Sequence, residues 1–329
     1  MRLADIAGVV GPRAQNLSRR RGLAVLVSLT LLGIILWRIH PERLIQVFSQ
    51  LRTGPLLGAV ACVFGAALLL AVRWRWMLEL QGVHDGFLAA WRGVLVGNAL
   101  SAALLGAVLG DVGKSAWYAR RHDHAFSSVL LACGLDRFCG GLGLVLYTLV
   151  TVLAATTSGA RIVGPWELKT RLLWTLLGVA VVTLIGSIWL FQRVRQRWPE
   201  QQAEFHRRIG AAWQTLRRRP GRLAGAVAVS FVANLLIGST LACGLAAASP
   251  DPLPWRSLLW TFPTIGLAAS LPFTFAGAGA REGAALAIWA WFGIPAPVAV
   301  AATLVTLLAT LTGAIPGCLL FWQGDAPRR

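Results

Sequence analysis

The chain has 329 residues, of which 56% are hydrophobic and 13% are charged, and its mean hydropathy is +0.65. Soluble domains carry about 25% charged residues, so this composition excludes a soluble globular protein and indicates an integral membrane protein. Lys and Arg outnumber Asp and Glu by 31 to 13. The arginines lie mainly beside apolar segments, where they orient helices and meet anionic lipid headgroups, so the basic excess does not indicate nucleic-acid binding.

Eight apolar segments approach or exceed the about 20 residues that cross a bilayer. In chain order they are residues 23–37, 55–72, 91–109, 129–156, 172–191, 223–248, 258–275 and 298–322. With a cytoplasmic N-terminus, 21 Lys and Arg residues lie in cytoplasmic segments and seven on the other side. Because cytoplasmic loops carry the basic excess, we predict a multi-pass protein of the inner membrane with both termini in the cytoplasm.

This charge distribution requires that two of the segments do not cross. Basic residues flank residues 91–109 on both sides, so that segment is predicted to enter and leave from the cytoplasmic face. The same parity argument makes residues 258–293 dip in from the opposite face. Both predicted hairpin tips contain helix breakers: Gly110 and Gly113 in the first, and Pro272, Gly277 and Gly279 in the second. Paired interrupted segments are typical of transporters built from inverted repeats.

We therefore predict an all-α polytopic membrane protein with about six crossing helices and two re-entrant hairpins in two inverted repeats. Residues 1–21 are expected to form a cytoplasmic arm, residues 22–322 a single integral-membrane domain and residues 323–329 a cytoplasmic tail. The domain is predicted to consist of a first half, residues 22–156, and a second half, residues 172–322. A basic amphipathic cytoplasmic loop at 193–222 is expected to join them. Arg73 and Trp74, in RWRW at the end of the second segment, are typical of the interface between bilayer and water.

The sequence GAVLGDVGKS at residues 106–115 ends like a phosphate-binding loop. Val108 stands where that motif has its first glycine, and no strand pattern precedes it, so nucleotide binding is not indicated. We interpret residues 110–114 as a hairpin tip in which Lys114 offers a positive charge close to a helix N-terminus, a position that favours anions. A lipid phosphate is the candidate anion.

Four further ionisable residues lie in apolar surroundings, namely Asp136, Arg137, Arg281 and Glu282. A charge at the membrane centre costs about 2.5–3.5 kcal/mol or more, so these side chains should face the interior and pair. Adjacent residues on a helix do not face each other, so we predict pairing between the halves: Asp136 with Arg281 or Lys114, and Glu282 with Arg137.

Together with Asp111 and Asn98, these residues would line a central polar cavity that binds an anionic lipid headgroup. The alternative is that the buried charges only hold helices together. No metal site is expected, because His122 and His124 have no third ligand of clear spacing, and the five cysteines lie mostly within apolar segments as packing residues. No catalytic motif and no cofactor-binding motif is found.

The chain resembles the integral-membrane domain of the lysylphosphatidylglycerol synthase family from about residue 20 to residue 322. The resemblance rests on RWRWML after the second segment, the glycine-rich tip with Asp111 and Lys114, LDRF around Asp136, and LPFTFAGAGAREGAA, which begins at Leu271 and is close to the family pattern L-P-x-x-x-G-G-x-G-x-R-E. The chain departs from the family at the first tip, which usually has Leu-Pro and an arginine, and at Asp136, where Glu is usual. These departures bear on headgroup preference.

The synthases carry a soluble aminoacyl-transferase domain after the membrane part, whereas this chain ends at Arg329. The resemblance therefore implies a stand-alone, flippase-like member that moves a phospholipid or other anionic lipid between leaflets. Lys114, Arg137 and Arg281 would capture the headgroup while the acyl tails stay in the bilayer. The alternatives are an accessory or scaffold protein for a separately encoded lipid-synthesis enzyme and, less favoured, a lipid group-transferase.

Overall fold

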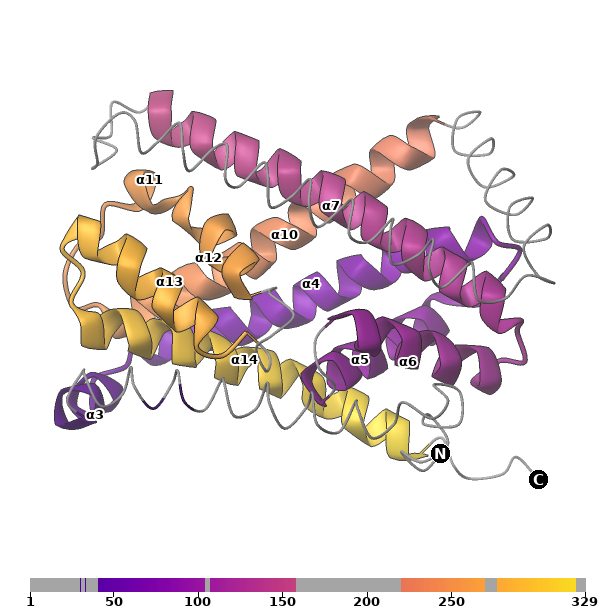
Figure 1. Cartoon of the computed structure of the whole chain (residues 1–329), viewed down its shortest axis with the longest axis horizontal. Helices are drawn as coiled ribbons and strands as arrows, with labels where there is room; N and C mark the ends of the chain where they lie inside the picture. The colour runs from indigo at the N-terminus through magenta and orange to yellow at the C-terminus, as the bar shows by residue number, and fades with distance from the viewer. Residues whose placement is uncertain are drawn as a thin grey trace.

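The computed structural model describes residues 41–103, 107–157, 220–269 and 277–323, together with residues 30 and 33. This part of the chain is helical and contains no strand (Figure 1). Its elements in chain order are α3 (Pro41–Ser49), α4 (Thr53–Glu79), α5 (Phe87–Ala103), α6 (Ala107–Arg121), α7 (Phe126–Thr157), α10 (Pro220–Ala248), α11 (Trp255–Leu258), α12 (Thr261–Ala269), α13 (Ala280–Trp289), the 3-10 helix η2 (Ala290–Phe292) and α14 (Ala296–Gln323).

Four of the described helices are long and apolar enough to cross a membrane: α4, α7, α10 and α14. Each has at least 27 residues, about 40 Å at 1.5 Å per residue, which exceeds the about 30 Å of hydrocarbon. The predicted all-α, polytopic class is therefore confirmed. The predicted crossing at 172–191 lies outside the described residues, as does the crossing at 23–37 apart from residues 30 and 33. Of the predicted amphipathic loop 193–222, only residues 220–222 are described, and they begin α10.

Helices α4 and α10 pack face to face in opposite directions. A Cβ added at Gly58, near the start of α4, would lie 3.3 Å from Sγ of Cys243, near the end of α10. A Cβ at Gly65 would lie 3.2 Å from Leu236, and further along the side chain of Arg73 bonds Ser230. Small residues are what bring membrane helices this close, since lipid supplies no hydrophobic force between them. The two halves of the chain therefore meet along this interface.

The order long helix, helical hairpin, long helix occurs twice. In the first half α5 and α6 form the hairpin between α4 and α7, and in the second half α12 and α13 form it between α10 and α14. The packing corresponds as well: α5 lies on α4 as α12 lies on α10, and α6 lies on α7 as α13 lies on α14. This correspondence supports the predicted inverted repeats, which stay a prediction.

The predicted helix breakers behave differently in the two hairpins. Gly277 and Gly279 have φ of 77° and 87°, in the left-handed region where glycine is favoured, and Gly279 caps the start of α13. Gly110 and Gly113 lie inside α6, so their interpretation as breakers is wrong. A Cβ at Gly110 would lie 2.8 Å from the backbone of Ser101 on α5, so this glycine permits close packing within the hairpin. Pro272 lies outside the described residues.

Each hairpin packs into its own hydrophobic core. The first core surrounds the fully buried Trp74 and Tyr118, which meet edge to face with ring centroids 4.8 Å apart. The second surrounds Trp289, whose indole N–H donates a hydrogen bond of 3.0 Å to Oγ1 of Thr261 on α12. The hairpins are thus fixed to the long helices at defined positions, and the charged side chains they carry are fixed with them.

The crossing of α7 and α10 provides a test of glycine-mediated packing. A Cβ at Gly143 would lie 2.8 Å from the carbonyl carbon of Ser230, whereas a Cβ at Gly141 would meet nothing within 4 Å. We expect Gly143→Ala to destabilise the protein by about 1–3 kcal/mol through overpacking and to lower its melting temperature in detergent. Gly141→Ala, on the same helix, should leave the melting temperature unchanged or raise it slightly, because alanine favours the helix more than glycine does. Equal melting temperatures for the two variants would contradict this packing.

Candidate functional site

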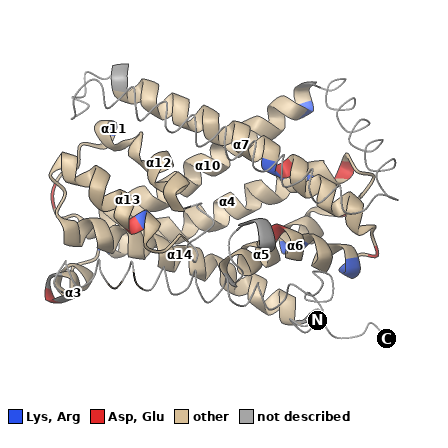
Figure 2. Cartoon of the chain, in the orientation of Figure 1, with Lys and Arg blue, Asp and Glu red and all other residues tan. Residues whose placement is uncertain are grey.

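Five charged side chains from three helices gather where the first hairpin meets the long helices. Arg73 comes from α4, Asp111 and Lys114 from α6, and Asp136 and Arg137 from α7. Figure 2 shows charged residues together on these helices, and a separate acid and base couple on α13. Since α4, α6 and α7 all pack in the first hydrophobic core, this charged cluster lies on a rigid framework.

The most enclosed part of the charged cluster is the pair Arg73 and Asp136. Nε of Arg73 donates to Oδ1 of Asp136 at 2.7 Å, and Nη2 donates to Oδ2 at 2.8 Å. The remaining terminal nitrogen, Nη1, donates to Oγ of Ser230 on α10 at 2.9 Å. Bidentate, charge-assisted bonds of this kind are among the strongest in proteins. They join three long helices, α4, α7 and α10, at one buried point.

The second part of the charged cluster is open to the exterior on one side. Nε of Arg137 lies 2.5 Å from Oδ2 of Asp111, and Nζ of Lys114 lies 4.0 Å from the other carboxylate oxygen. The side chain of Arg137 is 53% exposed, while that of Lys114 is 7% exposed. Nζ of Lys114 also lies 4.2 Å from the ring centroid of Trp74, close enough for a cation–π interaction.

The stem of Lys114 is accommodated by a glycine on the neighbouring helix. A Cβ at Gly97 of α5 would lie 2.7 Å from Cδ of Lys114. Asn98, the next residue, is partly buried on the same helix. The first hairpin thus encloses the lysine between α5 and Trp74 of α4, and the ammonium group is held beside Asp111.

The predicted pairs, Asp136 with Arg281 or Lys114 and Glu282 with Arg137, are not the ion pairs of the structure. Asp136 pairs with Arg73, and Arg137 pairs with Asp111, so both pairs lie within the first half. In the second half Nε of Arg281 lies 3.5 Å from Oε1 of Glu282, its neighbour in sequence. Both residues are buried, and Glu282 is fully inaccessible.

The couple on α13 forms because Glu282 also caps its own helix. The backbone N–H of Gly279 donates to Oε2 of Glu282 at 2.6 Å, which is the half of a capping box that a glycine N-cap allows, and this bond turns the carboxylate back along the first turn and beside Arg281. An acid in the first turn also complements the positive end of the helix dipole.

Arg73 was not identified as a site residue from the sequence, in which RWRW was interpreted as a motif of the bilayer interface. It is 5% exposed, because α4 continues to Glu79 and because α7 and α10 cover it. The signal that could have found it is the buried carboxylate of Asp136, which needs a cation from another helix.

A separate polar group closes the base of the first hairpin. Tyr118 Oη donates to Oδ2 of Asp85 at 2.7 Å, and Nε2 of His124 lies 2.9 Å from the same oxygen. Burial by itself would raise the pKa of Asp85, but the hydrogen bonds from Tyr118 and His124 and the nearby charge of His122 outweigh it and hold the pKa below its ordinary value. Among the described residues, no group of three His, Cys, Asp or Glu side chains has the arrangement of a metal site.

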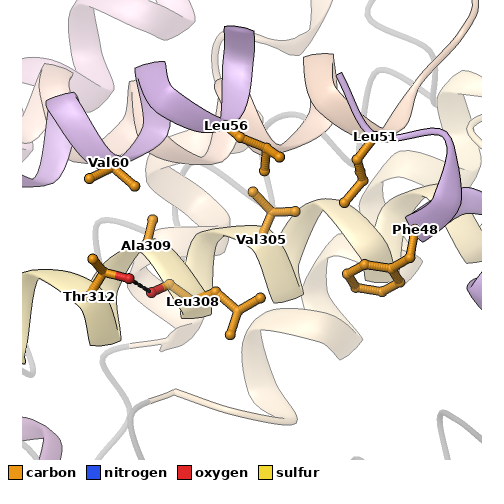
Figure 3. Close-up of a pocket in the computed structure, with 8 residues that line it drawn as sticks. All are labelled: Phe48, Leu51, Leu56, Val60, Val305, Leu308, Ala309 and Thr312. Carbon is orange, nitrogen blue, oxygen red and sulfur yellow. Dashed lines mark hydrogen bonds between the residues drawn. The ribbon is translucent and has the colours of Figure 1, made fainter. Parts of the chain in front are cut away.

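An apolar groove lies between α3, α4 and α14 (Figure 3). Its volume is about 220 Å³, and its lining residues are Phe48, Leu51, Leu56, Val60, Val305, Leu308, Ala309 and Thr312. The hydroxyl of Thr312 is occupied, because it donates to the backbone oxygen of Leu308 at 2.9 Å. No charged residue lines the groove, so it suits hydrocarbon and not a headgroup.

Membrane-length helices, two helical hairpins and the buried ion pair of Arg73 and Asp136 between helices define a multi-pass helical membrane protein with charged groups inside the bundle. The family model described as the lysylphosphatidylglycerol synthase TM region matches residues 22–317. The chain belongs to this family.

One curated relative is a UPF0104 membrane protein of Pyrococcus horikoshii, which is 23% identical over 168 residues. The match covers 50% of this chain and 47% of the relative, so the chain spans about half the length of the curated protein it matches. No solved structure matches the chain. The family places the protein in a membrane-lipid context.

The hydrogen bonds of Asp85 predict a defined dependence of stability on pH. A carboxylate whose pKa is lowered by folding stabilises the protein above its unfolded pKa of about 3.9, and this contribution is lost as the pH falls through the lower folded pKa. We expect Asp85→Asn to be less stable than wild type at pH 7 and to lose less stability below about pH 4. Thermal melts across pH measure both effects.

The matched control is Asp251→Asn, because Asp251 is exposed. This variant should keep the acid sensitivity of the wild type. Superimposable acid profiles of wild type and Asp85→Asn would show that the contacts of Asp85 do not stabilise the fold.

Proposed function

We propose that this protein lets an anionic lipid cross between the leaflets of the membrane, and that the charged cluster of the first half binds its headgroup. The observation that carries the proposal is the charge balance of that cluster. Three positive side chains, Arg73, Lys114 and Arg137, face two negative ones, Asp111 and Asp136, which leaves one positive charge without an acidic counterpart in the cluster. An excess cation within a bundle of membrane-spanning helices is costly unless an anion compensates it.

The exposure of the cluster supports a route for the headgroup. Arg137 is half exposed and Lys114 is enclosed behind it, and both share Asp111. A phosphate would first meet the guanidinium of Arg137, which suits it geometrically, and would then approach the ammonium of Lys114. The acyl tails would stay among the apolar outer faces of the bundle, where leucines of α7 and α14 are exposed.

The second half would provide the counterpart of this site. Gly277 and Arg281 have the spacing of Gly110 and Lys114, and each cation lies on the second helix of its hairpin. We therefore assign Arg281 and Glu282 to the headgroup path of the second half, and Asn98 as a neutral donor in the first. A two-fold relation between the halves in the membrane plane is the arrangement that alternating access uses.

The proposed orientation follows from the distribution of basic residues. Both termini are assigned to the cytoplasm, and the membrane to the inner membrane, because 21 Lys and Arg residues then lie in cytoplasmic segments. In this orientation the polar group of Asp85, Tyr118 and His124 lies at the cytoplasmic base of the first hairpin. A phospholipid or another anionic lipid is the proposed partner.

Reconstitution tests the proposed function. Purified protein in vesicles that contain a tail-labelled anionic phospholipid should let dithionite reach label from the inner leaflet, beyond the fraction accessible in protein-free vesicles. We expect Lys114→Gln and Arg137→Gln to slow this transfer by about tenfold or more, since a charge-assisted bond contributes about 1.5–3 kcal/mol.

Arg92→Gln is the matched control, because Arg92 is an exposed arginine of the same hairpin. It should transfer lipid at the wild-type rate. Equal leaflet exchange with and without wild-type protein across a panel of lipids would rule out transport. Wild-type rates in both cluster variants would rule out this headgroup site.

A further inference from the structure

Arg73 occupies both oxygens of Asp136, and all three nitrogens of its guanidinium donate a hydrogen bond to a neighbouring side chain. Its three nitrogens bond Oδ1 and Oδ2 of Asp136 and Oγ of Ser230 at 2.7–2.9 Å. The group also packs against α7, where a Cβ at Gly140 would lie 3.0 Å from Nη1. The side chain of Arg73 is only 6% exposed, and each of its three guanidinium nitrogens already donates to Asp136 or Ser230, so this residue is not open to a headgroup.

Asp136 nevertheless acts on the residues that can reach a headgroup. Asp136 is adjacent to Arg137 on α7 and lies with Lys114 in the charged cluster, so its carboxylate attracts both of these cations as well as Arg73. At short range in a medium of low polarity, one charge more or less changes binding strongly, because the interaction scales inversely with the local dielectric constant. The charge that a ligand meets at Lys114 and Arg137 therefore depends on whether Asp136 is neutralised.

We propose that Arg73 determines the ligand specificity of the site by neutralising Asp136. With that pair cancelled, Lys114, Arg137 and Asp111 leave a net charge of +1, which matches a ligand carrying a single negative charge, such as a phosphodiester. This inference rests on the proposed headgroup site and adds the charge of the ligand and the residue that sets it.

The alternative role for Arg73 is purely structural, as the bond that joins α4, α7 and α10. The net charge of the five-residue cluster, which is +1 in the wild type, separates the two roles. Arg73→Gln lowers this net charge to zero, and Asp136→Asn raises it to +2. The double variant Arg73→Gln with Asp136→Asn keeps the net charge at +1, and so does the single variant Arg73→Lys. A structural role predicts that function follows stability, whereas a charge role predicts that binding follows net charge.

The experiment measures binding of two tail-labelled lipids to full-length protein in detergent, by fluorescence anisotropy at pH 8. One is a phosphodiester lipid with one negative charge, and the other is a phosphomonoester lipid whose charge approaches −2. Melting temperatures are recorded for each variant. We expect Arg73→Gln to bind the phosphodiester about tenfold more weakly or worse, and Asp136→Asn to shift preference toward the phosphomonoester.

The decisive variants are the two that keep the charge at +1. Both the double variant and Arg73→Lys should bind the phosphodiester within about threefold of wild type, although both lose bidentate bonds and should melt at lower temperature. If Arg73→Gln does not fold, these two variants decide alone. Affinities that follow melting temperature, or a folded double variant that binds as weakly as Arg73→Gln, would overturn the inference.

The same samples separate this inference from the proposed function. If affinity for the phosphodiester follows net charge across the variants but the wild type transfers no lipid in vesicles, the inference stands and the proposed transport is contradicted. If the wild type transfers lipid but the affinities of the variants do not follow net charge, only the inference is contradicted. Protein that binds neither lipid removes the headgroup site and the inference together.

Discussion

A hydrocarbon environment cannot solvate charge, and this constraint explains the arrangement of the polar residues in the bundle. Asp136 is stabilised between long helices because Arg73 donates two charge-assisted bonds to it, while Nη1 of Arg73 donates to Ser230. Removing one partner of such a buried pair costs about 3–5 kcal/mol, because the other charge is left uncompensated. The pair therefore fixes the relative positions of α4, α7 and α10, and with them the place where the first hairpin can pack.

Glycine is the second determinant of the fold, and it acts mainly through close approach. Gly58 and Gly65 bring α10 against α4, and Gly110 brings α5 against α6. Glycine in a helix costs about 1 kcal/mol relative to alanine, so it is retained where a neighbouring backbone occupies the space of a side chain. Here this packing creates the enclosed position of Lys114, which leans over Gly97 toward Trp74.

The sequence predicted the class of the fold well, because long apolar segments with few charges are stable in a membrane as helices, which satisfy their own backbone hydrogen bonds. It also predicted that Asp136, Arg137, Arg281 and Glu282 need partners, since the cost of a buried charge does not depend on the details of packing. The partners themselves could not be predicted. Which helix faces Asp136 depends on tertiary contacts, and Arg73 lies in a sequence that is typical of an interface.

The remaining errors have local causes. The rule that adjacent helical residues do not meet fails at Glu282, because this residue turns back to cap Gly279 and its carboxylate comes beside Arg281. The rule that glycine breaks helices fails at Gly110, where packing within the hairpin outweighs propensity, and holds at Gly277 and Gly279, whose positive φ values require glycine.

In the described part of the chain, the capping role of Glu282 makes the buried charges of the two hairpins unequal, although the hairpins pack alike. Its carboxylate lies against Arg281 and the start of α13, so the charged couple of the second half is neutral, while the cluster of the first half carries an excess positive charge. An anion near Arg281 would therefore meet a guanidinium that already lies beside a carboxylate, whereas an anion near Lys114 and Arg137 would meet more positive than negative charge. Hairpins of like packing would thus differ in their affinity for anions.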